Sequence, residues 1–346
     1  MGADGEDAVV DVGVVGAGPA GLHAALKAAL LYHTAVIFDK GKKHSRIFFA
    51  PKVNNIPGFP GGISGADLMR RQREHIAAYE EEQGRKFVEL VEPVEVVSVA
   101  RASPEEPFEI VARDVRTGGE VRRRARVVVL ATGVVDRQPY IGDWELKDIR
   151  PILPYANKGT VDYCLLCDGH VVAGKTVAVI GNGKSAVGIA TALRDRFEAR
   201  PTVVACVTCT DVDEGTDVEA ANEAIRASAG KRGIPVILNT IDSLYGLKEG
   251  RLGLKFQDGT TAEFDKGFLS LGWHQMNTDL ARPLGALFDD DGYVRTTHDC
   301  EVLGEGEEPI PGLFAIGDIR SESWKQIPIA LGDAESAIIH AFAERL

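Results

Sequence analysis

Two cysteines three residues apart, Cys164 and Cys167, are the side chains best suited to chemistry in this sequence. They lie in the segment YCLLCDGH, immediately before Asp168 and Gly169. A pair with this spacing can bind a metal ion, form a structural disulfide or cycle between a dithiol and a disulfide. Each interpretation requires different partners elsewhere in the chain.

A zinc site would need a second pair of ligands, and the only other C-x-x-C pair is Cys206 and Cys209. Thirty-eight residues separate Cys167 from Cys206, whereas paired-cysteine zinc sites usually have about 15 to 20. The segment PTVVACVTCT has the pattern of a β-strand, in which residues three apart are about 10 Å apart and face opposite sides. These two cysteines would therefore share neither an ion nor a disulfide, which needs Cα atoms within about 7 Å. We expect no metal site, and interpret Cys206 and Cys209 as core residues, with a redox role as the alternative.

A working dithiol is the interpretation of Cys164 and Cys167 that the sequence favours. At the start of a helix, free N–H groups and the helix dipole stabilise a thiolate. Lowering a thiol pKa from about 8.5 to about 7 raises the thiolate fraction at pH 7 from roughly 3% to roughly half. Asp168 directly follows the pair, and one interpretation of this residue is a carboxylate that only stabilises the positive end of the helix.

Two segments that resemble each other predict the elements that position this pair. VGVVGAGPAGLHAAL (12–26) and VAVIGNGKSAVGIAT (177–191) each combine an apolar strand, a glycine turn and a helix. In such a unit, glycines allow close backbone approach and the helix N-terminus offers free N–H groups to a pyrophosphate. In the first copy, the segment TAVIFD also brings Asp39 to the position expected for a ribose-binding carboxylate. A tight turn without a ligand is the alternative for each copy.

The remaining pattern predicts that both halves contain the same order of parts. We expect a helix over 64–83 and a small antiparallel sheet from VEVVSVA, FEIVAR and VRRRARVVVLATG. A hairpin with its turn at Asp258-Gly259 follows the second glycine turn. The segment FLSLGWHQMNTDL is predicted as a strand that leaves the second half, and the C-terminal region as a strand, a polar loop and a long amphipathic helix.

Composition limits the possible functions. The chain has 346 residues, 45% of them hydrophobic, which favours two compact domains. Its 39 basic and 51 acidic residues give a net charge of −12, which disfavours nucleic-acid and anionic-membrane partners. The sequence has neither a signal-peptide pattern nor a run of 18 apolar residues, so we expect a cytoplasmic protein without a membrane span.

The ordered motifs GAGPAG, NNIPGFPGGISGADL, ATG, YCLLCDG, GNGKSA and GLFAIGD…KQI…A…GDA resemble the low-molecular-weight thioredoxin reductase family over nearly the whole chain. The resemblance implies an α/β fold of two Rossmann-like dinucleotide-binding domains of three-layer ββα type, the second inserted into the first. It implies an FAD domain over 1–137 and 276–346, and an NADPH-type domain over 138–275 that carries the dithiol. It also implies a thioredoxin-like or other dithiol/disulfide partner and a homodimer.

The resemblance also assigns roles to individual residues. Cys167 would exchange electrons with the flavin, and Cys164 with the external dithiol or disulfide. Asp168 would serve as proton donor or acceptor. The residues that would contact FAD are grouped here by their expected position: Gly16, Gly18, Pro19, Ala20 and Gly21 at the pyrophosphate; Asp39 at the adenosine ribose; Asn55 on the flavin side; Thr132 and Gly133 at the floor of the pocket; and Gly317, Asp318, Lys325, Gln326 and Ile327 along the ribityl chain and isoalloxazine ring.

The chain departs from the family where NADPH would bind. NADPH-dependent members carry a His-Arg-Arg cluster that binds the 2′-phosphate, whereas residues 201–225 contain no Lys, Arg or His and several acids, among them Asp211 and Asp217. The second glycine turn persists, and Lys184 is unfavourable at a helix N-terminus unless an anion binds there; a lysine that extends into water is the alternative. The turn's candidate cofactor-binding residues are Gly181, Asn182, Gly183, Lys184, Ser185 and Ala186.

These features most resemble the diflavin-linked disulfide oxidoreductases of cyanobacteria, which hold a second FAD in the NADPH position. The sequence therefore predicts a flavoprotein disulfide oxidoreductase that uses FAD and not NADPH, with a second FAD as an added cofactor. The alternatives are an NAD(P)H-dependent thioredoxin reductase, in which Asp211 serves NADH, and a flavin-binding redox sensor without turnover. The loop GKKHSRIFFAPK near the expected flavin also departs from the family's Gly-Gly-Gln pattern.

Overall fold

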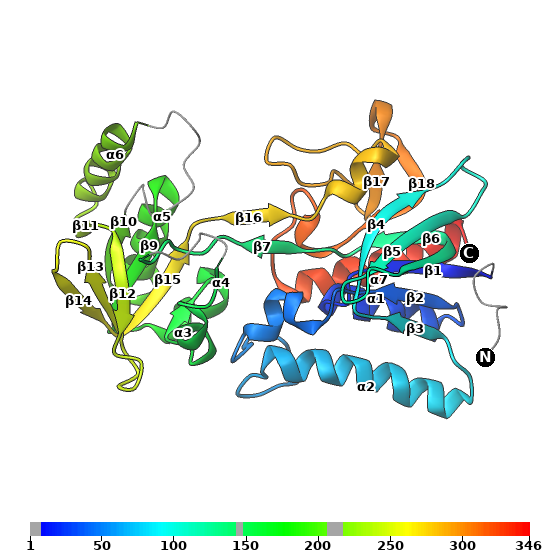
Figure 1. The fold of residues 1–346 in the computed structure, drawn as a ribbon, viewed down its shortest axis with the longest axis horizontal. Coiled ribbons are helices and arrows are strands. Elements are labelled where there is room, and N and C mark those ends of the chain that lie inside the picture. The colour runs from blue at the N-terminus through cyan, green and yellow to red at the C-terminus, as the bar shows by residue number, and fades with distance from the viewer. Residues whose placement is uncertain (1–7, 143–147, 206–216) are drawn as a thin grey trace.

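Two lobes joined by two strands make up the chain in a computed structural model that describes residues 8–142, 148–205 and 217–346 (Figure 1). The first lobe combines the N-terminal and C-terminal parts of the sequence, and the second lobe comes from the middle. Cys206, Cys209 and Asp211, which the sequence analysis singled out, lie outside the described residues.

The first lobe is built on an eight-stranded sheet in which β6 has two roles. The C-terminal half of β6 pairs in parallel with β1 and β18, and its N-terminal half pairs antiparallel with β5. The small antiparallel sheet expected from the sequence therefore shares one long strand with the parallel sheet. The strands are β1 (Val9–Val15), β2 (Ala35–Phe38), β3 (Val88–Val91), β4 (Val94–Ala100), β5 (Phe108–Asp114), β6 (Glu120–Leu130), β17 (Glu301–Leu303) and β18 (Pro309–Ala315).

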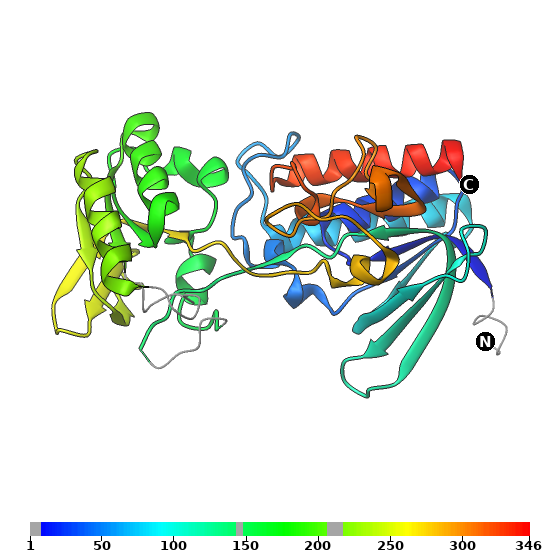
Figure 2. The same ribbon diagram turned by 90° about the horizontal axis from the view of Figure 1, so that it is seen from above.

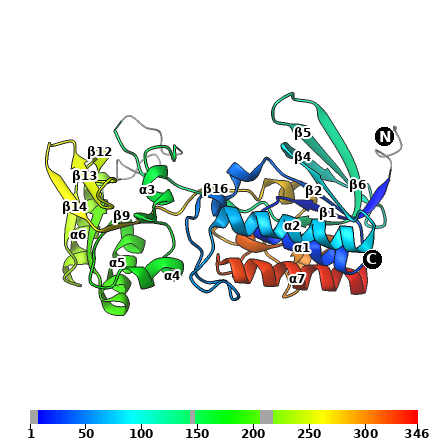
Figure 3. The same cartoon turned by 90° about the horizontal axis from the view of Figure 1, so that it is seen from below.

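Three helices cover the face of the parallel sheet opposite β4 and β5: α1 (Pro19–Leu30), α2 (Gly65–Gln83) and α7 (Ile327–Glu344) (Figure 3). The alanines of α1 are buried, and their small side chains let the helix pack closely against its neighbours. Ser64 caps the start of α2 by accepting a hydrogen bond from the Asp67 backbone N–H at 3.1 Å. None of the helices in the described ranges is long and apolar enough to cross a membrane.

The second lobe contains a five-stranded parallel sheet of order β11-β10-β9-β15-β8 and a three-stranded antiparallel sheet of order β12-β13-β14. The predicted turn at Gly259 joins β13 to β14. The strands are β8 (Val161–Asp162), β9 (Thr176–Gly181), β10 (Arg200–Ala205), β11 (Val236–Leu238), β12 (Ile241–Tyr245), β13 (Leu252–Phe256), β14 (Thr261–Phe264) and β15 (Lys266–Ser270). The helices are α3 (Leu153–Asn157), α4 (Leu165–Asp168), α5 (Gly183–Phe197) and α6 (Val218–Gly230).

The lobes are connected by a two-stranded antiparallel ribbon, which we call the linker ribbon (Figures 1 and 2). It consists of β7 (Val134–Asp136) and β16 (Trp273–Met276), with Trp273 opposite Asp136. The sequence predicted one strand where β15 and β16 occur, because it did not show that Gly272 adopts a φ of 73° and separates them. The second lobe is thus inserted between β7 and β16, and the predicted α/β class with two Rossmann-like domains is confirmed.

Candidate functional site

The C-x-x-C pair lies on the second lobe at the side that faces the first. Cys164 and Cys167 form a disulfide with their Cα atoms 5.2 Å apart. Cys164 caps the four-residue helix α4, and its Sγ accepts a hydrogen bond from the Cys167 backbone N–H at 3.1 Å. The expectation that a helix dipole tunes this pair needs correction, since a single turn has a small dipole. The local N–H group is the feature that would stabilise a Cys164 thiolate.

Side chains from the first lobe contact both sulfurs. Gln326 Nε2 is 3.3 Å from Cys164 Sγ and 3.4 Å from Cys167 Sγ. Asn55 Nδ2 donates to Gln326 Oε1 at 2.8 Å and fixes the orientation of that amide. The fold thus brings together two residues that the sequence assigned to the flavin side and the two cysteines. Ile327 packs against a small apolar cluster of the first lobe that contains Val53, Ile63 and Leu68.

Asp168 has the protonation behaviour that proton transfer near neutral pH requires. Burial, and to a smaller degree the negative charge of Asp162, raise the pKa of Asp168 to about 6, and Lys266 opposes the shift. Lys266 forms an ion pair with Asp162 at 3.0 Å. A carboxyl group with a pKa close to the working pH can both give and take a proton beside the cysteines.

The first glycine turn has the geometry of a ligand cradle. Gly16 has a φ of 105°, and a Cβ atom there would lie 2.4 Å from the Ala131 carbonyl oxygen. A Cβ on Gly21 would lie 1.9 Å from the Gly16 carbonyl oxygen, so helix α1 approaches the turn more closely than any other residue allows. Gly18 differs, because a Cβ there would be 3.7 Å from the nearest protein atom. The protein's own packing does not require a glycine at 18, and the open space fits a bound pyrophosphate.

The neighbours of this turn also fit FAD. Pro19 and Ala20 begin α1 directly after the cap residue Gly18. Asp39 accepts hydrogen bonds from the backbone N–H groups of Ala17 and Gly41, both at 2.7 Å. Each carboxylate oxygen can accept a second bond, so Asp39 retains the capacity to bind a ribose hydroxyl.

Thr132 and Gly133 lie just before β7 and are hydrogen-bonded to Asn277, which lies just after β16. Thr132 Oγ1 donates to the Asn277 carbonyl oxygen at 2.6 Å, and Asn277 Nδ2 donates to the Gly133 carbonyl oxygen at 3.1 Å. Gly133 has a φ of 65° with no protein atom within 4 Å of an added Cβ. Its conformation explains the glycine, and the space beside it is compatible with the expected cofactor.

The C-terminal motif is held by ion pairs that the sequence did not reveal. Gly317 N–H donates to Asp333 at 3.0 Å, and Asp333 is also paired with Arg320. Lys325 Nζ donates to the Arg320 carbonyl oxygen at 2.7 Å, and burial lowers the pKa of Lys325. The cofactor role expected for Lys325 remains a prediction, because the protein itself already binds its ammonium group.

Asp318 is paired with an arginine that the sequence analysis missed. Arg46 NH1 donates to Asp318 Oδ2 at 2.8 Å. Arg46 lies in η2 (Arg46–Phe49), within the loop that departs from the family's Gly-Gly-Gln pattern. That departure was the available signal. Asp318 Oδ1 remains for the ribityl contact that the resemblance implies.

The second glycine turn has structural reasons for its glycines. A Cβ on Gly181 would lie 2.2 Å from the Ser270 carbonyl oxygen, and Gly183 has a φ of 72°. Asn182 caps α5, Ala186 is fully buried, and Ser185 Oγ is 3.0 Å from Ser270 Oγ. Gly183, Lys184 and Ser185 are exposed at the helix start, where free N–H groups can meet an anion.

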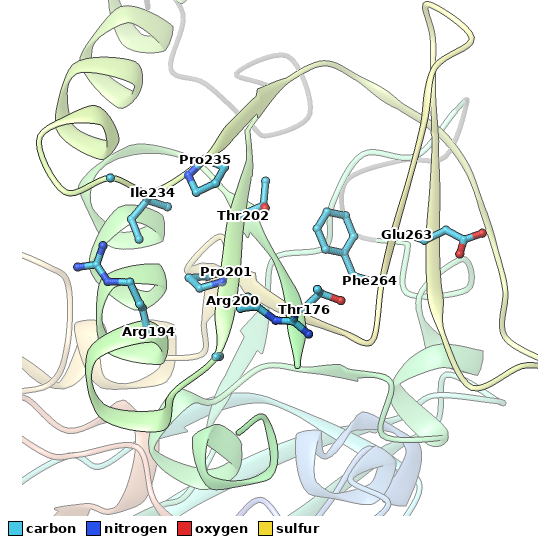
Figure 4. A pocket seen from close by; sticks show the side chains of 11 residues that line it. Thr176, Arg194, Arg200, Pro201, Thr202, Ile234, Pro235, Glu263 and Phe264 are labelled. Carbon is cyan, nitrogen blue, oxygen red and sulfur yellow. The ribbon is translucent and has the colours of Figure 1, made fainter. Parts of the chain in front are cut away.

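The second lobe also contains a pocket of about 340 Å³, whose lining includes neither the cysteines nor the residues of the glycine turns (Figure 4). It is lined by the first residues of β9 and β10, Thr176 and Arg200, together with Arg194 and Phe264. Ligands of open parallel sheets bind at the carboxyl ends of the strands, and this pocket is at the opposite edge. We therefore place the candidate site at the disulfide and the two glycine turns.

Comparison with known proteins relates this architecture to one enzyme family. The sequence profile of the family described as pyridine nucleotide-disulphide oxidoreductase matches residues 10–334. The thioredoxin reductase of Mycoplasmopsis pulmonis is 25% identical, with 96% of each chain covered. The bifunctional thioredoxin reductase/thioredoxin of Mycobacterium leprae is 29% identical over 97% of this chain and 66% of its own length. The crystal structure of a thioredoxin reductase from Streptococcus pyogenes MGAS5005 superposes with a TM-score of 0.73 at 23% identity, covering 97% of this chain and 98% of that one.

Proposed function

The chain belongs to the pyridine nucleotide-disulphide oxidoreductase family, and on that premise we propose that it moves two electrons between FAD and the Cys164/Cys167 pair. The observation that carries the proposal is the contact of Gln326 with both sulfurs, at 3.3 and 3.4 Å. It brings the dithiol of the second lobe to the part of the first lobe that would hold the flavin. Bound FAD would supply a two-electron acceptor or donor.

The side chains around the disulfide account for the rest of the chemistry. Oxidation of two thiols to a disulfide releases two electrons and two protons. The Cys167 backbone N–H would stabilise the Cys164 thiolate. Asp168, with a pKa of about 6, would accept a proton in one direction and donate it in the other. Gln326 and Asn55 would orient the pair toward the flavin.

Single-cysteine variants test this proposal. A thiolate beside oxidised flavin produces a long-wavelength charge-transfer absorbance band. We expect the band in reduced Cys164→Ser, which retains Cys167, and not in Cys167→Ser. Cys300→Ser is the matched control, because Cys300 is buried and burial raises its pKa to about 12. Absence of the band in both site variants under anaerobic conditions would contradict the assignment of Cys167.

The proposed partner is a protein with a thioredoxin-like cysteine pair. Trp324 is 71% exposed and lies two residues before Gln326, which contacts the disulfide, and Leu166 is 61% exposed and lies between the two cysteines. The three segments that meet there, 55–63, 163–167 and 326–331, contain no charged residue in a chain that is 26% charged. Asp168 and Lys325 directly adjoin these segments, so the charge-free part is limited to the segments themselves, and the exposed apolar side chains suit a partner whose own cysteines lie on an apolar surface. A homodimer remains an expectation from the resemblance.

We further propose that the second lobe binds FAD in place of NADPH. The support is the exposed Lys184 at the start of α5 together with the absence of Lys, Arg and His from residues 201–225. FAD shares the adenosine pyrophosphate of NADPH and lacks the 2′-phosphate. Release of bound cofactor by denaturation should then yield close to two FAD per chain. One FAD per chain in protein saturated with flavin would overturn this finer proposal and leave the dithiol chemistry intact.

A further inference from the structure

One guanidinium group, that of Arg46, contacts both strands of the linker ribbon. Arg46 Nε donates to Asp136 Oδ2 at 2.6 Å, and NH2 donates to Asp136 Oδ1 at 3.0 Å, which is a bidentate pair with the last residue of β7. The Arg46 guanidinium carbon is also 4.8 Å from the ring centroid of Trp273, the first residue of β16. Asp136 and Trp273 are opposite each other in the ribbon.

The third contact fixes this arginine to the first lobe. Arg46 NH1 donates to Asp318 Oδ2 at 2.8 Å, and all three guanidinium nitrogens therefore bind carboxylates. The side chains of Arg46, Asp136 and Asp318 are only 28%, 17% and 21% exposed, so solvent screens their attraction less than in a surface pair. Bidentate geometry adds directional specificity that a lysine cannot reproduce.

One chain of contacts runs from Arg46 to the cysteines through Asp136, the last residue of β7. Gln138, which is buried, donates through Nε2 to the Asp136 carbonyl oxygen at 3.2 Å. Tyr163 donates its hydroxyl to Gln138 Oε1 at 2.8 Å and directly precedes Cys164. Burial raises the pKa of Tyr163, which keeps this hydroxyl protonated as a donor.

A second chain of contacts runs from Arg46 to Gln326 through Trp273, the first residue of β16. Trp273 Nε1 donates to the Tyr293 hydroxyl, and Lys325 Nζ lies 3.8 Å from the Tyr293 ring centroid. Lys325 is the residue before Gln326, which contacts both sulfurs. The two paths thus end on the two sides of the same contact between the lobes.

We propose that Arg46 is a positioning residue that clamps the linker ribbon to the first lobe and thereby keeps Cys164 and Cys167 against Gln326. The clamp acts through Asp136 and Trp273 and touches neither sulfur. Its consequence for electron transfer rests on the proposed function, whereas its effect on the exposure of the cysteines does not.

Alkylation of the reduced cysteines by iodoacetamide, followed by mass spectrometry of the Cys164/Cys167 peptide in the cofactor-loaded protein, tests the clamp. We expect at least fivefold faster alkylation in Arg46→Met. We expect an intermediate rate in Arg46→Lys, which keeps the positive charge and loses the bidentate hydrogen bonds to Asp136. Arg122→Met is the matched control, since Arg122 pairs with two carboxylates of the same lobe, those of Glu109 and Glu120, away from the ribbon. Its rate should equal that of the wild type.

Two further variants keep the test decisive. Trp273→Leu removes the contact with β16 together with the Trp273–Tyr293 hydrogen bond, leaves both carboxylate pairs of Arg46 in place and should also accelerate alkylation. Asp136→Asn keeps the shape of the side chain, weakens the bidentate pair with Arg46 and should give an intermediate rate. Wild-type rates in Arg46→Met and Trp273→Leu, with unchanged circular dichroism, would overturn the clamp. Failure of a dithiol to bleach the flavin of the wild type would instead overturn the proposed function, and the alkylation comparison would still decide the clamp.

Discussion

The two glycine turns have similar sequences and different backbones. In the first turn, positive φ occurs at Gly16, and Gly18 caps the helix with a φ of −70°. In the second, positive φ occurs at Gly183, which corresponds to Gly18 and is already inside the helix that Asn182 caps. Helix α5 therefore begins one residue earlier in the repeat than α1 does. Residues at equivalent positions of the two copies therefore adopt different backbone conformations.

The third position of the repeat shows the same divergence. Gly21 lets α1 pack against the Gly16 carbonyl, where a Cβ would be 1.9 Å away. The corresponding Ala186 accommodates its Cβ in the core, so α5 is farther from its turn. In the first turn, close backbone packing explains the glycines at 16 and 21. It does not explain the glycine at 18, where a Cβ would have room. In the second turn, packing and φ explain the glycines, and the exposed Lys184 is the feature that points to a ligand.

Alanine at Gly18 should lower FAD affinity without lowering stability, whereas alanine at the corresponding Gly183 should lower stability without releasing the dithiol-linked FAD. The loss of FAD affinity is the largest effect that we expect. Gly18→Ala fits the protein but narrows the space for a pyrophosphate, so FAD affinity should fall about 100-fold, or about 2.7 kcal/mol, with unchanged melting of the FAD-free chain. Gly183→Ala places a side chain at a φ of 72° and should cost about 1 kcal/mol of unfolding free energy. It should leave the dithiol-linked FAD bound. Calorimetric titration with FAD and thermal melting measure both variants, and equal loss of FAD in both would refute the contrast.

Local spacing made the cysteine pair, the glycine turns and the hairpin at Gly259 predictable from the sequence. The clamp was not predictable, because Arg46, Asp136 and Asp318 are far apart in the chain and only the fold brings them together. The double role of β6 was visible in the sequence only in part. Its alternating first half indicated an antiparallel strand, and its continuous apolar end, VVVL, was the trace of burial on both faces.

The second turn should also bind NADPH weakly, because the cations that would bind its 2′-phosphate are missing from residues 201–225. We expect this effect to be smaller than that of Gly18→Ala. A lost charge-assisted hydrogen bond costs roughly 1.5 to 3 kcal/mol, or about one to two decades of affinity. Asp217 gives no compensation, because a carboxylate repels the 2′-phosphate; in this structure it caps α6 by accepting from the Ala220 N–H at 3.0 Å. Rapid anaerobic mixing should show that micromolar NADPH bleaches the flavin at least tenfold more slowly than an excess of a small dithiol. Fast bleaching by NADPH would make the NAD(P)H-dependent thioredoxin reductase the better interpretation.

The smallest expected effect concerns the charge of Lys184, and its sign tells whether an anion binds at the second turn. A cation near a helix N-terminus is unfavourable by roughly 0.3 to 1 kcal/mol when no anion is present, and an acid there is favourable by a similar amount. In cofactor-free protein, Lys184→Glu should therefore raise the unfolding free energy by about 1 kcal/mol, and Lys184→Gln by about half of that. With saturating FAD the order should reverse, because the carboxylate would repel the pyrophosphate that the lysine attracts, while the FAD of the first turn stays bound. Thermal melting with and without FAD measures both signs. Stabilisation by Lys184→Glu under both conditions would show that the second turn holds no anion, so that the lysine only extends into water and the two turns differ in function as well as in backbone.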